Sequence, residues 1–495
     1  MSSTGAGLVT VSSDSGPRWG ELIGVRRRTL RTGLPYRGAA AILGLCLLSA
    51  ACDSTSPPEK KAEPSADTAE DFEPLPRGNP PALKTKLSTE QIQKCLYRSP
   101  IDLDSIAGAY FSPEDFVQDQ VETGRSLDFD APEVELLGAK AFDDAVVGSG
   151  TSVPPDKRVT TKLLAWALGI TPQGFNVNFF LGGDDAGLVA GFYDPRSQRV
   201  VIEKSGKLDS EYVVMAHEFA HAAADQRFGL PPKKVQPIVD DVSLARSSLV
   251  EGDASLSELR VLSRLSPPKT LEKEIAARIA FKEKFTEGRG RGIPYLLIDT
   301  ALFPYQSGLA FACSVFREKG WGGLDRAFSK PPTTTAQILF PERFIDKEKT
   351  LDPPRLTRPG PLWQLRDQGH IGAAHLKAMF QAPGDKENQA LSRPLSRAAA
   401  WAGGNYRVWT VGTASSEYTV GLSFVEHEDY KGVLCSSLTK WYRAAFGDAE
   451  PKLIADRVVH FDGSQQEAIL SCQDREIKMA FAPNLDLARP IIGLD

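Results

Sequence analysis

The sequence lacks an excess of basic charge. Its 495 residues carry a formal net charge of −5. The first 51 residues hold six Arg against Asp14 and Glu21, so they carry +4 and the remainder carries −9. Nucleic-acid-binding domains show the opposite pattern, a clustered positive charge. The charge balance therefore gives no support for a nucleic-acid partner.

The N-terminus also lacks an apolar run of membrane-spanning length. Residues 39–51 form an apolar run of secretory-signal length that follows Arg26–Arg28, Arg31 and Arg37, and it is too short to cross a bilayer comfortably as a helix. Residues 48–52, Leu-Ser-Ala-Ala-Cys, then resemble a bacterial lipobox, although Ser49 stands where an aliphatic residue is usual. The resemblance implies cleavage before Cys52 and lipid attachment to its thiol.

Residues 1–51 are accordingly interpreted as a lipoprotein-type signal peptide, with an ordinary signal peptide and a retained membrane anchor as alternatives. Residues 52–86 are rich in Pro, Ser, Glu and Lys and nearly free of large apolar side chains, which predicts a disordered tether. The expected location is outside the cytoplasm, lipid-anchored to the bacterial cell envelope and facing the periplasm or the cell surface.

Cysteine is scarce, with six residues in the whole chain. Cys46 and Cys52 belong to the proposed leader and lipid site, so Cys95, Cys313, Cys435 and Cys472 remain, and four thiols allow three full pairings. Cys435 with Cys472 is the most local pairing. Cys313 lies in an apolar helical run and is also compatible with a buried free thiol.

Histidine is equally scarce, with six residues, which makes His217 and His221 informative. The segment His-Glu-Phe-Ala-His places two imidazoles one helical turn apart, and Glu218 beside the first. An N-cap signal at Asp209, an apolar helical pattern to Phe228 and a stop at Gly229 predict the helix. This spacing indicates a two-point zinc clamp with a general base; two ordinary helix histidines are the alternative.

A catalytic zinc site needs a third protein ligand and an open position for water. Glu251 is the candidate, on a second helical pattern from about Asp240 to Leu265. Small neighbours such as Gly252 let that helix approach the first closely, and glycine inside a helix otherwise costs about 1 kcal/mol. Asp253 and Glu258 are competing candidates for the third ligand. The alternative is that all three carboxylates are solvated charges on the helix face.

Two short strands are predicted just before the histidine helix, over Leu188–Pro195 and Arg199–Ile202. A strand beside the helix is able to pair with an extended peptide substrate. An ordinary surface hairpin is the alternative interpretation.

These motifs together resemble a family of secreted or membrane-anchored bacterial and archaeal metallopeptidase-like proteins of gluzincin type. The resemblance rests on AHEFAHAAADQRF, LVEGDA, VAGFYDP, FPYQSGLAF and PPTTTAQILFPERF, and covers about residues 158–344 with specific motifs. It implies Zn²⁺ held by His217, His221 and Glu251, with Glu218 as general base and acid. Asp225 matches the family pattern, and either orients a ligand through a hydrogen bond or stabilises the helix surface.

The oxyanion formed during peptide hydrolysis needs a further hydrogen-bond donor. Tyr305 is the candidate because gluzincins often use Tyr or His there, and Tyr295 is its rival. Either side chain is equally compatible with an aromatic core position.

The chain is too long for one ordinary core, and its 41% hydrophobic and 24% charged residues are normal for a globular protein. We expect an α+β protein with an N-terminal helical and loop region (87–157), a mostly helical zincin-like catalytic body with a small sheet (158–350), and a C-terminal region with a small α+β domain (351–495). Strands are predicted at 406–411, 418–425, 457–461, 468–472 and 477–481, and a helix at 428–446. His370 and His375, five residues apart, do not share a helix face and do not predict a second metal site.

Two classes of function fit these patterns. The first is a membrane-tethered zinc metallopeptidase that hydrolyses peptide bonds with a zinc-activated water and a Glu general base. The second is a catalytically silent lipoprotein of zincin fold that binds or organises components of the envelope. A peptide or protein substrate and the membrane, through the lipid anchor, are the expected partners.

Overall fold

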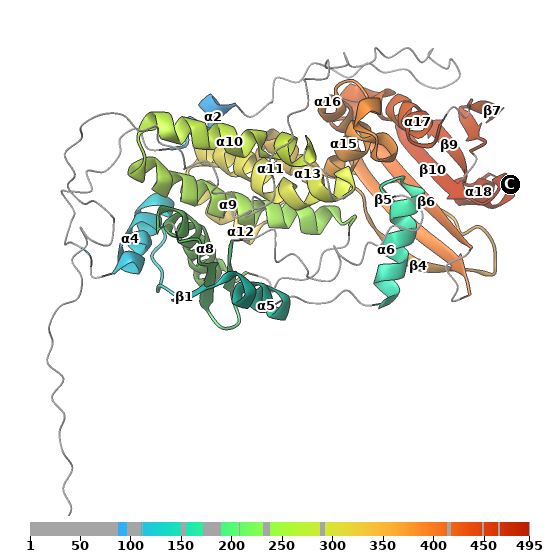
Figure 1. Cartoon of the computed structure of the whole chain (residues 1–495). Helices are drawn as coiled ribbons and strands as arrows, with labels where there is room; N and C mark the ends of the chain where they lie inside the picture. Colours follow the sequence, from blue (N-terminus) through green and yellow to red (C-terminus); the bar gives the residue numbers. More distant parts are fainter. Residues whose placement is uncertain are drawn as a thin grey trace, which may run out of the picture.

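A computed structural model describes most of the chain after residue 87 (Figure 1). The described residues are 88–96, 110, 112–149, 155–171, 190–206, 208–230, 238–287, 293–412, 417–447, 450–463 and 466–494. The predicted signal peptide, the tether and the proposed lipid site at Cys52 lie outside them. Of the helices in this part of the chain, none is both long and apolar enough to cross a membrane.

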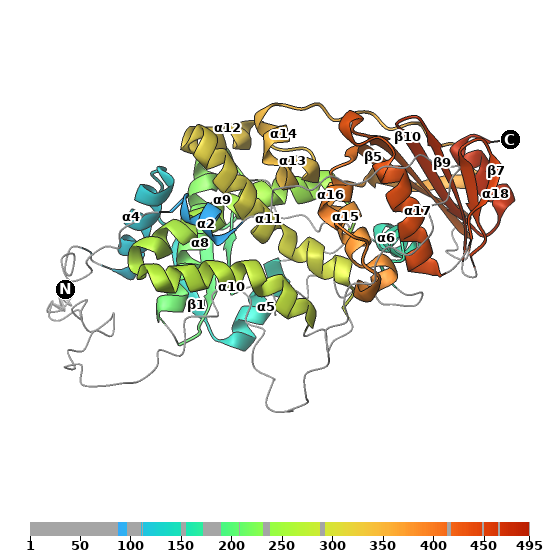
Figure 2. The same cartoon turned by 90° about the horizontal axis from the view of Figure 1, so that it is seen from above.

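The protein is of mixed α+β class, as the sequence predicts, with a helical body at one end and a large antiparallel sheet at the other (Figures 1 and 2). The helices are α2 (Thr89–Gln93), α4 (Pro113–Arg125), α5 (Ala139–Ser149), α6 (Pro155–Ala167), α8 (Leu208–Phe228), α9 (Asp241–Leu265), α10 (Pro268–Glu287), α11 (Tyr295–Lys319), α12 (Trp321–Ser329), α13 (Thr335–Leu339), α14 (Pro341–Ile345), α15 (Ala373–Gln381), α16 (Pro394–Ala398), α17 (Val433–Phe446) and α18 (Leu485–Ile492). The strands are β1 (Glu133–Leu137), β2 (Gly191–Asp194), β3 (Arg199–Glu203), β4 (Trp363–His370), β5 (Trp401–Val411), β6 (Tyr418–Glu426), β7 (Lys452–Ala455), β8 (Val458–Phe461), β9 (Glu467–Gln473) and β10 (Glu476–Ala482).

The helical body is built on α8, α9 and α11, and the predicted end of α8 and the predicted limits of α9 are confirmed. α8 starts at Leu208, so Asp209, predicted as its N-cap, lies inside the helix. α8 ends at Phe228 because Gly229 takes a positive φ of 73°, which favours glycine. α9 starts after Asp240, whose side chain accepts a hydrogen bond from the amide of Ser243 at 3.1 Å. α11 ends at Gly320, which also has a positive φ. These helices pack against one another around a shared apolar core.

A three-stranded sheet with the order β1-β3-β2 lies against α8. β2 and β3 form the antiparallel hairpin that the sequence predicts, although the first residues of the predicted strand, before Ala190, lie outside the described part. β1 pairs with β3 in parallel and was not predicted. Because β1 and α4 come from residues 87–157 and pack into the helical body, that stretch is part of the body rather than a separate region.

The C-terminal sheet has seven strands in the order β4-β5-β6-β10-β9-β8-β7. Alternating side chains face opposite sides, so Val408 joins the core under α15, α16 and α17, whereas Trp409 joins the core that α18 covers. The five predicted strands are confirmed, but β4 and β7 were missed. The helix predicted over 428–446 starts only at Val433, because Gly432 takes a positive φ of 83° before it.

One continuous apolar core joins the helical body to the sheet. It includes Leu163 on α6, Leu296 on α11 and Phe424 on β6. α6, assigned from the sequence to the catalytic body, packs on the sheet, where Thr160 donates a 2.9 Å hydrogen bond to Asp367 on β4. The predicted boundaries at 157/158 and 350/351 therefore do not separate independent cores.

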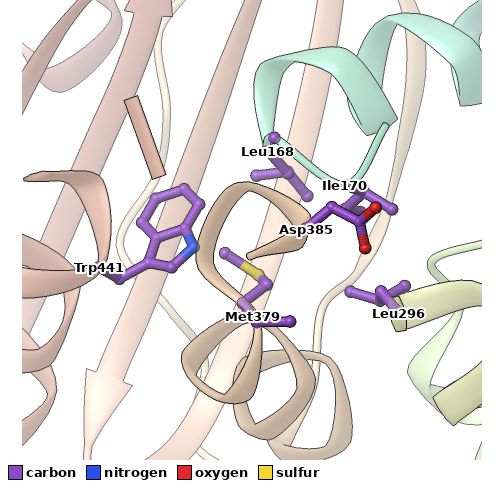
Figure 3. A pocket seen from close by; sticks show the side chains of 8 residues that line it. Leu168, Ile170, Leu296, Met379, Asp385 and Trp441 are labelled. Carbon is purple, nitrogen blue, oxygen red and sulfur yellow. The ribbon is translucent and has the colours of Figure 1, made fainter. Parts of the chain in front are cut away.

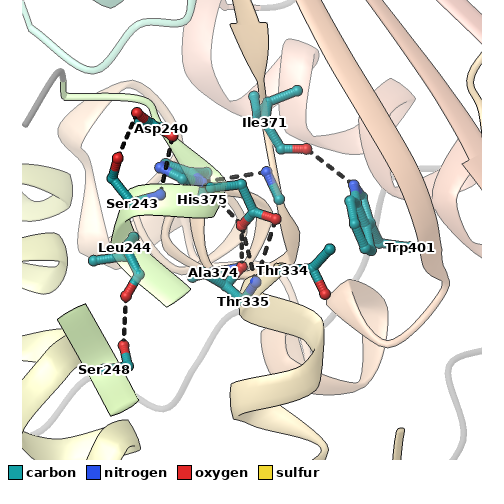
Figure 4. A network of polar contacts seen from close by, with 12 residues as sticks. Asp240, Ser243, Leu244, Ser248, Thr334, Thr335, Ile371, Ala374, His375 and Trp401 are labelled. Carbon is teal, nitrogen blue, oxygen red and sulfur yellow. Dashed lines mark hydrogen bonds and ion pairs between the residues drawn. The ribbon is translucent and has the colours of Figure 1, made fainter. Parts of the chain in front are cut away.

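Polar contacts reinforce this junction where α9 begins (Figure 4). The buried carboxylate of Asp241 accepts hydrogen bonds from the amide and hydroxyl of Thr335, whose hydroxyl in turn accepts one from the amide of Ala374. Burial raises the pKa of Asp241 to about 7, although the bonds from Thr335 oppose this. His375, also buried here, has its pKa lowered by burial to about 4. His375 is therefore a neutral packing residue at the junction.

A cavity of about 10 Å³ lies where α6, α11, α15 and α17 meet (Figure 3). It has room for about one water molecule and is far too small for a substrate. Its lining residues are Leu168, Gly169, Ile170, Leu296, Met379, Ala382, Asp385 and Trp441.

The four cysteines of the described chain form two disulfides. Cys435 on α17 pairs with Cys472 on β9, as predicted for the most local pairing. Cys95, just after α2, pairs with Cys313 on α11. The interpretation of Cys313 as a buried free thiol is therefore wrong: an apolar helical run indicates burial, but only the fold brings its partner from 218 residues away.

Candidate metal centre

The two histidines of α8 face α9, because the opposite side of α8 is fixed in the core. Phe219 and Ala220 are fully buried, and Phe219 packs edge-on against Phe129. His217 and His221 lie one turn apart, with ring centroids separated by 4.7 Å. The helix thus presents both imidazoles toward the same neighbour, as their spacing predicts.

Glu251 comes from α9 to complete a group of three ligand atoms. Its Oε2 lies 3.2 Å from Nε2 of His217 and 3.3 Å from Nε2 of His221. One ligand atom from each of the three residues lies within 4.8 Å of the others. Ligands of a tetrahedral zinc ion at about 2.0–2.1 Å stand roughly 3.3 Å apart, so the two distances from Glu251 are compatible with a shared metal ion. Among the described residues, no other group of three or more meets the same criterion.

The electrostatic surroundings favour a cation at this place. Burial opposes protonation of His217, but the carboxylates of Glu251 and Glu258 outweigh it and raise the pKa of His217 to about 10. Burial opposes ionisation of Glu251, but the two imidazoles outweigh it and hold the pKa of this carboxyl well below its usual range. A metal ion and a proton compete for the same ligand atoms, and this site attracts both.

Glu258 contacts a candidate ligand and lies outside the group of three candidate ligands. Its Oε2 lies 3.2 Å from Nδ1 of His217, on the far side of the ring from Glu251, and the residue is 5% exposed. With Nδ1–H donating to Glu258, Nε2 of His217 is the ring nitrogen that faces Glu251 and would bind a metal ion in place of a proton. The sequence singled out Glu258 only as a competing ligand; its position two turns after Glu251 was the available signal.

Asp253, the other competing ligand, points away from the site. It forms an ion pair with Arg125 of α4 at 2.8 Å, and both side chains are almost completely buried. Arg125 also contacts Asp325 of α12 at 2.8 Å. Asp253 thus ties α9 to α4 and α12 and is not a metal ligand.

Of the two roles predicted for Asp225, its contacts fit the one that stabilises the helix. One carboxylate oxygen accepts a 2.9 Å hydrogen bond from the hydroxyl of Tyr193 on β2, and the other accepts a 2.7 Å bond from the amide of Leu230. Asp225 therefore fastens the end of α8 to the sheet and to the following turn. Tyr193 precedes Asp225 by 32 residues in the sequence, so only the tertiary structure shows that the two side chains are partners.

Glu218 is buried at 6% exposure and lies beside the start of β2. A side chain at Gly191 would place its Cβ 3.5 Å from Cγ of Glu218 and 2.6 Å from Val214. Glycine at this position therefore lets β2 pass close to Val214 on α8, one helical turn before Glu218. Within the described sheet, β2 is an edge strand that pairs only with β3.

Tyr305 lies on the other side of the histidines, on α11. Its ring stacks at 30° on that of His217, with centroids 6.2 Å apart. Tyr295, the rival donor, belongs to the junction core, where its amide donates to Asp385. Of the two candidate tyrosines, only Tyr305 is thus placed beside the candidate ligands.

Comparison with known proteins adds no relative. The chain matches no protein-family model, no curated protein and no solved structure. The case for a function therefore depends on the chemistry of the site itself.

Proposed function

We propose that this protein is a zinc-dependent peptidase of gluzincin type, with a zincin-like catalytic body. The observation that carries the proposal is the convergence of His217, His221 and Glu251 within 4.8 Å, with Glu218 on the same helix as the two histidines. Two His and one Glu with a fourth position for water is the ligand set of catalytic zinc rather than of structural zinc.

In the proposed reaction, zinc, when bound, supplies a Lewis acid that polarises the scissile carbonyl and lowers the pKa of a water molecule. Glu218 takes the proton of the attacking water and passes it to the leaving amine. Tyr305 is proposed to donate its hydroxyl hydrogen to the developing oxyanion. Glu258 keeps the imidazole of His217 in the tautomer that binds through Nε2.

The proposed substrate is an extended peptide or protein segment. β2 is a sheet edge that starts beside Glu218, and its backbone is suited to pair with an extended chain. Such pairing contacts the backbone of the substrate rather than its side chains. It therefore suits a peptidase that accepts many substrate sequences.

The proposed location is the bacterial cell envelope, with the mature protein tethered through lipid on Cys52. The lipobox-like sequence before Cys52 and the following polar segment support this. In a bacterial host, the wild-type protein should fractionate with membranes and Cys52→Ser should not be lipid-modified. Equal labelling of both by a radioactive fatty acid would contradict the anchor.

The function is tested by comparing the mature protein with Glu218→Gln. We expect one zinc ion per chain in both proteins and cleavage of a mixed peptide library by the wild type alone, because Gln cannot act as a base. Wild-type protein that binds no zinc would overturn the proposal. Equal zinc without cleavage in either protein would leave the binding or organising module as the function.

The role of Glu251 is tested separately with Glu251→Ala. This variant should retain zinc much more weakly than the wild type, because it removes one of three proposed ligands and leaves only the two imidazoles. Asp253→Asn is unsuitable as a control because it breaks a buried ion pair. Unchanged zinc retention in Glu251→Ala would contradict the ligand assignment.

A further inference from the structure

The backbones of α9 and α11 touch at two glycines. A Cβ added to Gly252 would lie 2.2 Å from the carbonyl oxygen of Gly308, and one added to Gly308 would lie 2.2 Å from the carbonyl oxygen of Ser248. Neither neighbour is a flexible side chain, so any larger residue forces the two helices apart. The glycine pair sets the shortest distance at which these helices can cross.

This contact lies next to two residues of the candidate site. Gly252 directly follows Glu251 on α9, and Gly308 follows Tyr305 by three residues, which places both on one face of α11. The other sides of α9 are held independently, by Glu258 on His217 and by Asp253 on Arg125. If the crossing widened, α11 would move relative to the metal ligands.

The helical hydrogen bonds of α11 are incomplete where Tyr305 is attached. Pro304 lies inside the helix and has no N–H to donate to the carbonyl of Thr300. The single hydroxyl hydrogen of Thr300 is directed toward the carbonyls of Leu296 and Leu297, at 2.9 and 3.1 Å, and does not replace the missing donor. The helix alone therefore fixes Tyr305 less firmly than an uninterrupted helix would.

We propose that Gly308 is a positioning residue, which holds Tyr305 against His217 by allowing α11 to touch α9 at Gly252. The proposal rests on the function proposed above, since it concerns the donor to the oxyanion. It gives the two glycines a role beyond packing: they set the distance between the metal ligands and the group that stabilises the transition state.

The test is a double-mutant cycle of Gly308→Ala and Tyr305→Phe on the zinc-loaded protein. Gly308→Ala should lower kcat about 100-fold with little change in KM, the order expected for a misplacement of about 1 Å. In the Tyr305→Phe background, Gly308→Ala should lower kcat no further, because the hydroxyl that it would misplace is already absent. Independent, multiplying losses would show a merely structural role and overturn the proposal.

Gly403→Ala is the matched control. Its Cβ would meet the carbonyl oxygen of Leu351 at 2.0 Å, a similar backbone clash within the C-terminal sheet. We expect it to lower stability and leave kcat unchanged. A loss of kcat equal to that of Gly308→Ala would attribute both effects to general destabilisation and overturn the proposal.

A second measurement needs no catalytic turnover. In protein labelled with 3-fluorotyrosine and loaded with Co²⁺, the ¹⁹F resonance that disappears in Tyr305→Phe reports the distance of this ring from the metal. Gly308→Ala should reduce its paramagnetic relaxation clearly. Unchanged relaxation would overturn the positioning role, whereas absent turnover in the wild type would overturn the peptidase function alone.

Pro304→Ala keeps the proposal testable if Gly308→Ala does not fold. This variant restores a helical hydrogen bond and adds no bulk at the crossing. Because the glycine contact is proposed to place Tyr305, the relaxation and kcat should both stay at the wild-type level. A large loss in either would assign the placement to the proline and overturn the role of Gly308.

Discussion

Glu258→Gln should weaken zinc binding although Glu258 is not a proposed ligand. The carboxylate accepts from Nδ1 of His217 at 3.2 Å and is 5% exposed, so the interaction is buried and charge-assisted. Removing such a partner of a metal ligand typically costs about 10- to 100-fold in affinity. That range corresponds to about 1.4–2.8 kcal/mol.

The size of the loss in zinc affinity within this range depends on which hydrogen-bond acceptor each substitution leaves for His217. Glutamine keeps an acceptor for Nδ1–H but loses the charge, and a neutral hydrogen bond has about half the strength of a charge-assisted one. We therefore expect a loss of about 10-fold for Glu258→Gln. Glu258→Ala removes the acceptor entirely and should approach about 100-fold.

Asp225→Asn is the matched control, because the sequence offered the orienting role to Asp225 as one of two alternatives. Its contacts are the hydroxyl of Tyr193 and the amide of Leu230. This variant should lose about 1–2 kcal/mol of unfolding free energy and bind zinc as the wild type does. The measurement is competition for zinc between apoprotein and a chromophoric chelator. Wild-type affinity in Glu258→Gln with weakened affinity in Asp225→Asn would refute the assignment.

Two further predictions concern stability. Burial lowers the folded-state pKa of His375 to about 4, so protonation of this residue costs no stability above its unfolded pKa of about 6.5. As the pH falls from there toward 4, the unfolded state binds a proton that the folded state does not, and the folded state loses stability. The wild type should lose up to about 3 kcal/mol relative to His375→Gln between pH 7 and pH 4 in urea unfolding, and parallel pH curves would contradict this. The Cys95–Cys313 disulfide spans 218 residues and the Cys435–Cys472 disulfide 37. Replacing the first pair by Ser should therefore cost about 1.5 kcal/mol more than replacing the second, according to loop-closure entropy, and the reverse order would count against that account.

Local patterns predicted the elements that depend on neighbours in sequence. The end of α8 at Gly229 and the N-cap of α9 at Asp240 followed from turn and capping chemistry. β1 was missed because its pairing partner, β3, is more than sixty residues away, and nothing in residues 133–137 encodes that distance. The packing of α6 on the sheet was not predicted for the same reason: its apolar face indicates burial but does not specify the surface that covers it.

The sequence by itself determined that His217 and His221 lie on one face of a helix with Glu218 beside the first, because helix geometry fixes the relative positions of residues about one turn apart. Tertiary structure decided between the carboxylates. With about 100° of rotation per residue, Glu258 lies within about 20° of Glu251 on α9, whereas Asp253 lies about 200° away. Because the fold places Glu251 against the histidines, Glu258 faces them as well, whereas Asp253 faces Arg125. The rotation of α9 about its own axis, which decides the face that it turns to α8, is set by packing along both helices. No local sequence pattern predicts it.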